Sequence, residues 1–204
     1  MQTASRRRST RWSTKDGGLI RTGRCLTASL LPFQPMPQIT RDNLLSLETY
    51  AKERDAFRAK VIAHKKDRAV HVGGHVTLIF EDELDVYNPL IPDGDNLKAT
   101  MMIEYPDVAE RARMLAKMKG IEDRVWLQAE GCKRIFAIAD EDLPRENEEK
   151  TAAVHFLRFQ LDDETRESLK YGVPLAMGVD HPAYTEAQEV VGPGVRASLV
   201  GDLA

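Results

Sequence analysis

Residues 139–161 read ADEDLPRENEEKTAAVHFLRFQL, and this stretch carries the strongest indications of fold and function in the chain. Its first half is densely charged, whereas its second half is apolar with a histidine set among the apolar residues. The apolar half predicts a β-strand over 153–161. Because successive side chains point to opposite faces of a strand, we expect His155 to share one face with Leu157 and Phe159.

Further strands and several helices are predicted on either side of this strand. Further strands are expected at 76–80, 97–105, 124–128, 134–139 and 173–179, the third and fourth forming a hairpin around Glu130-Gly131. Helices are expected at 48–68, 107–119, 162–171 and 195–203. In the second helix Val108, Ala112, Leu115 and Met118 are expected to face inward. Strands joined by short turns, with helices between some of them, favour an α+β fold: a single domain with a mostly antiparallel sheet and helices packed on one side.

Composition narrows the class of protein. A chain of 204 residues with 42% hydrophobic and 30% charged residues is typical of one globular domain. The two cysteines, Cys25 and Cys132, have no partner pattern, which indicates a reducing compartment, hence the cytoplasm, and excludes a thiolate zinc site. The apolar runs are too short to span a bilayer, so no membrane association is expected.

Charge divides the chain into two segments. Residues 1–35 contain seven basic groups and one acid, which leaves the rest of the chain at −9 against a whole-chain charge of −3. An acidic domain does not indicate nucleic-acid binding. Residues 1–35 also lack apolar periodicity, so they are expected to form a disordered basic leader ahead of a single domain over 36–204. An interrupted twin-arginine signal, a transit peptide and sequence upstream of a start at Met36 all remain open explanations.

Acidic and imidazole side chains suggest a metal site. Asp140 and Asp142 follow directly on a predicted strand, so their carboxylates could meet His155 and His181 where the sheet ends. Such a set of oxygen and nitrogen ligands suits iron, manganese or zinc. The alternatives stay open: a solvated acidic loop, a core histidine at 155 and a surface turn at 181. For Arg158, on the other face of the strand, a structural ion pair is expected.

From Met36 onward the chain resembles an uncharacterised bacterial family known as domain of unknown function 3501. The matching segments are TRDNLLSLETY (40–50), FRAKVIAHKK (57–66), YNPLIPDG (87–94), KATMMIEYP (98–106), GIEDRVWLQ (120–128), ADED (139–142), KTAAVHFLRF (150–159) and GVDHPAY (178–184). Members are often encoded beside rubrerythrin-like di-iron proteins and iron–sulfur oxidoreductases. The resemblance therefore implies a role in redox or peroxide defence with such a partner.

This chain differs from the family that it resembles in two respects. The family begins near Met36, so the basic leader is extra. After the Phe-Glu-Asp of residues 80–82, members continue with a strand tail and a Glu/Arg-rich helix that this chain lacks. Loss of a packed helix would expose the apolar surface against which it docks.

Three hypotheses for function follow. The first is a cytoplasmic, non-catalytic accessory or binding protein that works with a redox partner, using a metal or cofactor site around Asp140, Asp142, His155 and His181. The second is an enzyme that uses the same cluster for metal-assisted or acid–base chemistry. The third is a truncated, non-functional family member.

Overall fold

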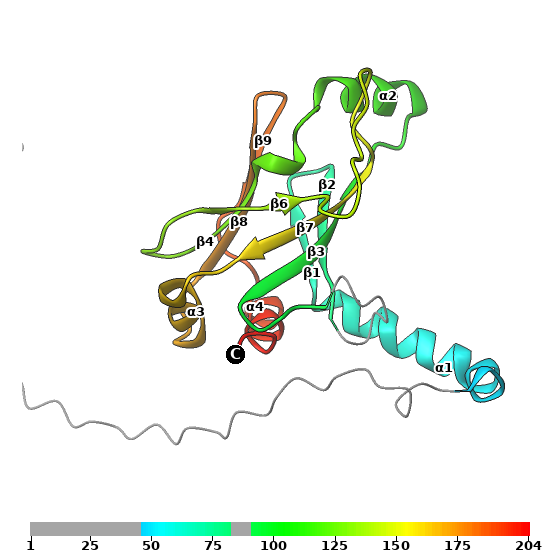
Figure 1. The fold of residues 1–204 in the computed structure, drawn as a ribbon, viewed down its shortest axis with the longest axis vertical. Coiled ribbons are helices and arrows are strands. Elements are labelled where there is room, and N and C mark those ends of the chain that lie inside the picture. The colour runs from blue at the N-terminus through cyan, green and yellow to red at the C-terminus, as the bar shows by residue number, and fades with distance from the viewer. Residues whose placement is uncertain (1–45, 83–90) are drawn as a thin grey trace, which may run out of the picture. The chain divides into compact units, whose positions relative to one another are not determined.

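The computed structural model describes residues 46–82 and 91–204. The predicted leader and the junction that follows Asp82 lie outside these residues. Within the described ranges the chain forms four α-helices, one short 3₁₀ helix and nine strands in two antiparallel sheets (Figure 1). The predicted α+β class with antiparallel strands is confirmed.

The first sheet has the strand order β1-β2-β3-β7-β6. Its strands are β1 (Ala69–Val72), β2 (Val76–Phe80), β3 (Asn96–Ile103), β7 (Val154–Gln160) and β6 (Ile138–Ala139). The central pair is β3 and β7, in a register that sets Met101 opposite His155 and Lys98 opposite Arg158. As the alternation of side chains predicts, His155, Leu157 and Phe159 are buried, whereas Val154 is exposed.

The second sheet has the order β5-β4-β8-β9. It contains β5 (Ile135–Phe136), β4 (Val125–Ala129), β8 (Leu175–His181) and β9 (Tyr184–Gln188). The predicted hairpin is confirmed, because β4 pairs antiparallel with β5. Gly178 on β8 lies under the Trp126 ring, where a Cβ atom would come within 2.4 Å of the indole, so a larger residue does not fit there.

The two sheets are joined at both edges. On one side the chain passes from β5 to β6, and so from one sheet to the other, across the single buried residue Ala137. On the other side the hydroxyl of Tyr184 in β9 donates to the main-chain oxygen of Val72 in β1 at 2.6 Å. The core lies between the sheets and contains the inward side chains of both.

The helices begin where capping residues predict. Asp107 and Asp162 cap α2 (Val108–Lys117) and α3 (Asp163–Lys170), accepting from the main-chain nitrogens of Glu110 and Thr165. Of the side chains predicted to face inward in α2, Leu115 and the following Met118 are buried, but Val108, which is 68% exposed, and Ala112 are not. The expectation was wrong for these two because only the last part of the helix reaches the core.

The two remaining α-helices are α1 (Leu47–Lys66) and α4 (Pro193–Val200). Their predicted positions agree within a few residues, but the sequence patterns missed β1 and β9. β1 begins only three residues after α1 ends, directly after the predicted helix 48–68, and no strand was predicted there. No helix in the described part of the chain is long and apolar enough to cross a membrane.

Candidate metal site

His155 is the central residue of the site. It lies on β7 and its side chain is completely buried. Its Nδ1 atom lies 2.6 Å from Oδ2 of Asp140. Its Nε2 atom faces the other way, 2.9 Å from the hydroxyl of Thr151 and 3.1 Å from the main-chain oxygen of Ala152. The imidazole is therefore held in a polar setting on both edges, although its strand neighbours belong to the hydrophobic core.

Asp140 is fixed in place by its backbone and by three donors. It follows β6 directly and has a φ of 49°, in the left-handed region that Asp tolerates better than most residues. Its Oδ1 atom accepts from the main-chain nitrogen of Phe156 at 3.0 Å and from Arg145 at 3.0 Å. Its other oxygen is left for His155. A carboxylate held in this way fixes the orientation of the imidazole ring.

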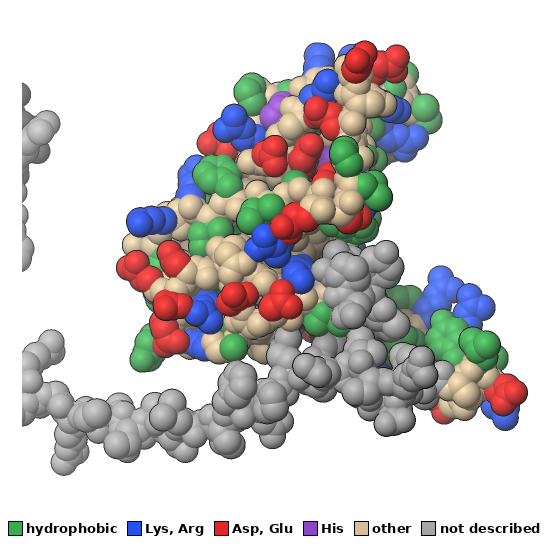
Figure 2. Space-filling model, in the orientation of Figure 1, with side chains coloured by type: hydrophobic (Ala, Val, Ile, Leu, Met, Phe, Trp, Pro, Cys, Tyr) green, Lys and Arg blue, Asp and Glu red, His purple; other side chains and the backbone are tan. Residues whose placement is uncertain are grey.

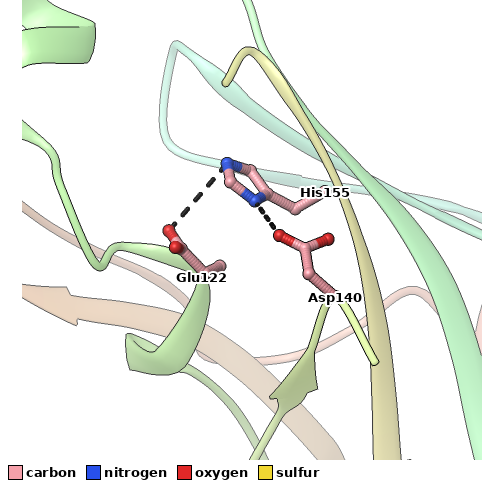
Figure 3. Close-up of side chains that lie close together, drawn as sticks. All are labelled: Glu122, Asp140 and His155. Carbon is pink, nitrogen blue, oxygen red and sulfur yellow. Dashed lines mark hydrogen bonds and ion pairs between the residues drawn. The ribbon is translucent and has the colours of Figure 1, made fainter. Parts of the chain in front are cut away.

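Glu122 completes the cluster from a distant part of the chain. It lies in the 3₁₀ helix η4 (Glu122–Arg124), and its side chain is 11% exposed. Its Oε2 atom is 3.9 Å from Nε2 of His155 and accepts from the Thr151 hydroxyl at 3.4 Å. One ligand atom from each of Glu122, Asp140 and His155 lies within 4.8 Å of the other two (Figure 3).

This arrangement gives the two carboxylates different roles. Each approaches a different nitrogen of one imidazole, and a single ion can bind only one of those nitrogens. Asp140 on Nδ1 matches the carboxylate that commonly orients a metal-binding histidine. Nε2 of His155 and the carboxylate of Glu122 are then the groups that could hold a divalent cation. One nitrogen and one carboxylate suit iron, manganese or zinc.

The structure brings together only part of the predicted set. Asp140 and His155 meet, but Asp142 turns outward and binds Arg145 through both oxygens, at 2.5 and 2.7 Å. His181 ends β8 in the second sheet, where its Nε2 atom lies 3.1 Å from the main-chain oxygen of Lys119. Its Nδ1 atom accepts from the main-chain nitrogen of Ala183. Neither residue joins the cluster around His155.

Arg158 lies on the opposite face of β7, and its partner Glu141 follows β6. Arg158 donates to both oxygens of Glu141, at 2.7 and 2.8 Å, so the predicted ion pair is present, on a half-exposed surface. A groove of about 390 Å³ runs over this face. It is lined by Asp93, Asp95, Asn96, Lys98, Glu141, Asp142, Phe156, Leu157, Arg158 and Gln160. Figure 2 shows acidic and basic side chains intermixed here. The groove does not include His155.

The pair formed by Asp142 and Arg145 makes a testable prediction. The hydrogen bonds from Arg145 lower the pKa of Asp142 from 3.8 to about 2. The pair therefore contributes to stability above pH 3.8, and this contribution is lost as the pH falls through about 2. In an Arg145→Gln variant we expect the pKa of Asp142 to return toward 3.8 in a carboxyl-carbon NMR titration. An unchanged pKa would contradict this assignment of the cause.

Comparison with other proteins identifies the family of the chain. The model of the family described as "Protein of unknown function (DUF3501)" matches residues 38–84 and 81–203. The chain belongs to this family. The two parts of the match meet at residues 81–84, where the resemblance implied a missing segment. Comparison with curated proteins finds no match.

A solved structure of similar sequence has the same fold. It is the crystal structure of a protein of unknown function from Burkholderia pseudomallei K96243, with 48% sequence identity and a TM-score of 0.75. The match covers 81% of this chain and 99% of that one. This chain thus shares its fold with that protein, and any function must be argued from the site.

Proposed function

We propose that the protein is a cytoplasmic, non-catalytic accessory protein that binds one divalent metal ion between Glu122 and His155. The observation that carries this proposal is that two carboxylates approach the two nitrogens of one fully buried imidazole. Charged groups are costly to bury, so the carboxylate of Glu122 beside the buried imidazole favours a further counter-charge, which a bound cation would supply. Asp140 acts as the orienting residue and Arg145 balances its remaining charge.

A buried site favours holding an ion over converting a substrate. A catalytic metal site needs an open position that water and substrate can reach. His155 is fully buried, and the groove on this part of the chain lies across β7 from it. A redox partner of the rubrerythrin-like or iron–sulfur class stays a prediction of the family resemblance. An iron- or manganese-loaded site would suit such a partner.

Metal content of the full-length chain tests the proposal. Purified protein is loaded with iron(II), manganese(II) or zinc(II), dialysed, and analysed by mass spectrometry and thermal unfolding. We expect about one equivalent of one of these ions to be retained. The melting temperature should rise, because an ion present at 100 times its Kd stabilises the native state by about 2.7 kcal/mol.

Two substitutions locate the ion. Glu122→Gln keeps the size of the side chain but removes the anionic ligand, and we expect at least a tenfold weaker affinity, about 1.4 kcal/mol. Asp142→Asn is the matched control, because it removes a neighbouring carboxylate outside the cluster, and it should leave binding unchanged. Protein that stays metal-free and melts at the same temperature with all three ions would refute the proposal. So would equal binding by Glu122→Gln.

A further inference from the structure

Helix α1 is exposed over most of its length. It has 20 residues, so it is about 30 Å long, and none of its side chains is buried. Its start is fixed by Ser46, whose hydroxyl accepts from the main-chain nitrogen of Thr49 at 3.2 Å. At its end His64 contacts Asp82 at 2.5 Å. Helices in proteins owe most of their stability to the packing of an apolar face, and α1 has an apolar face without such packing among the described residues.

The apolar face follows the spacing of a coiled-coil seam. Leu47, Tyr50, Arg54, Phe57 and Val61 are separated by three, four, three and four residues, and four of the five are apolar or aromatic. Leu47 is 87% and Tyr50 43% exposed, whereas Phe57 and Val61 are half-buried. The Tyr50 and Phe57 rings already contact each other edge to face, with centroids 6.5 Å apart. Such a seam on a helix is built to pack against a second helix.

We propose that α1 pairs antiparallel with α1 of a second copy of this chain. The seam is flanked by Glu53 and Lys60, which occupy equivalent positions one heptad apart. In an antiparallel pair Glu53 of each copy lies beside Lys60 of the second copy, which gives two attractive contacts related by a two-fold axis.

Seam residues complement one another in the same orientation. Tyr50 packs against Val61 of the second copy, and the guanidinium of Arg54 packs against the Phe57 ring of the second copy, a favourable cation–π geometry. A parallel pair would set Arg54 against its own counterpart and Lys60 beside Lys65, which are repulsive contacts, and only Glu53 beside Arg58 would be attractive. The charge pattern of α1 therefore favours a second copy in the antiparallel orientation, in which no repulsive contact opposes the two attractive ones.

Sedimentation velocity on the full-length chain tests this pairing. We expect a monomer–dimer equilibrium that depends on protein concentration, since a helix pair of this length is a small interface. Glu53→Lys and Lys60→Glu, each alone, place like charges together twice in the dimer and should raise the dissociation constant at least tenfold. The double variant Glu53→Lys/Lys60→Glu should restore the original value, because the swap recreates both attractive contacts.

A control distinguishes the effect of a charge change beside the seam from that of a charge change elsewhere on α1. Lys52→Glu changes a side chain on the outer face of α1 and should leave the equilibrium unchanged, and circular dichroism confirms that every variant keeps its helix content. A chain that stays monomeric at all concentrations overturns the proposal, including the case in which another segment of the same chain covers the seam. A dimer that ignores the single variants, or is not restored by the double one, also overturns it. The proposal does not depend on the metal site.

Discussion

Replacing Arg68 by methionine is expected to lower the free energy of unfolding by about 3–5 kcal/mol, as when one partner of a buried ion pair is removed. Arg68 follows α1 and is 1% exposed. It donates to the main-chain oxygens of Phe80 and Glu81 and to the hydroxyl of Ser198, at 3.0, 3.1 and 3.1 Å. It also pairs with Asp202 beyond α4. Methionine fills the space but leaves these acceptors without their donor.

The pH dependence of this loss provides an internal check. Burial raises the pKa of Asp202 above its ordinary value, while the hydrogen bond from Arg68 opposes the rise. Without Arg68 the pKa should rise further, so the carboxyl must bind a proton for the chain to fold. The penalty of Arg68→Met should therefore grow as the pH rises through the folded pKa, and should be smaller below the unfolded pKa.

Urea unfolding at several pH values measures both effects. Asp202→Asn in the Arg68→Met background should recover part of the loss at neutral pH, because it removes the unpaired buried charge. Arg113→Met is the exposed control. Arg113 lies 3.8 Å from Glu110 with both side chains largely in solvent, so its loss should cost no more than about 0.5 kcal/mol. Similar losses for Arg68→Met and Arg113→Met would contradict the structural role given to Arg68.

Replacing Asp140 by alanine is expected to cost about 3 kcal/mol, combining two effects. The first is the loss of the acceptor for His155, the Phe156 main-chain nitrogen and Arg145. The second is the left-handed backbone at a φ of 49°, which alanine adopts at a cost of order 1 kcal/mol.

Asparagine separates these two effects. Asp140→Asn tolerates the left-handed backbone and keeps an oxygen for the Phe156 nitrogen, so we expect it to lose about 1 kcal/mol. Chemical denaturation of the two variants without added metal gives the comparison. If asparagine and alanine were equally destabilising, the backbone contribution would be refuted. Asp142→Ala, two residues away on the surface, should change stability by less than either.

The sequence predicted those parts of the site that depend on local pattern. Alternation along 153–161 placed His155 on the buried face, and Asp140 directly after a strand was expected near the end of the sheet. Both predictions rest on distances of one or two residues along the chain. The α+β class was also predictable, since turns, caps and short apolar runs are local signals.

The remaining parts depend on how distant segments pack. Glu122 was missed because nothing in its local sequence distinguishes it from the exposed acids of the chain. It reaches His155 only through the packing of η4 against the first sheet. His181 was expected in the cluster, but β8 pairs with β4 in the second sheet, and its imidazole finds main-chain partners there. The strands β1 and β9 were missed because each is short and adjoins another element.

The segment from β5 to β6 affects how the protein unfolds. Because a few consecutive residues supply an edge strand to each sheet, pulling either sheet apart removes main-chain partners from the other. The most protected amide protons of both sheets should therefore report the same opening free energy in hydrogen–deuterium exchange, that of global unfolding, and the protein should lack a state in which one sheet survives alone.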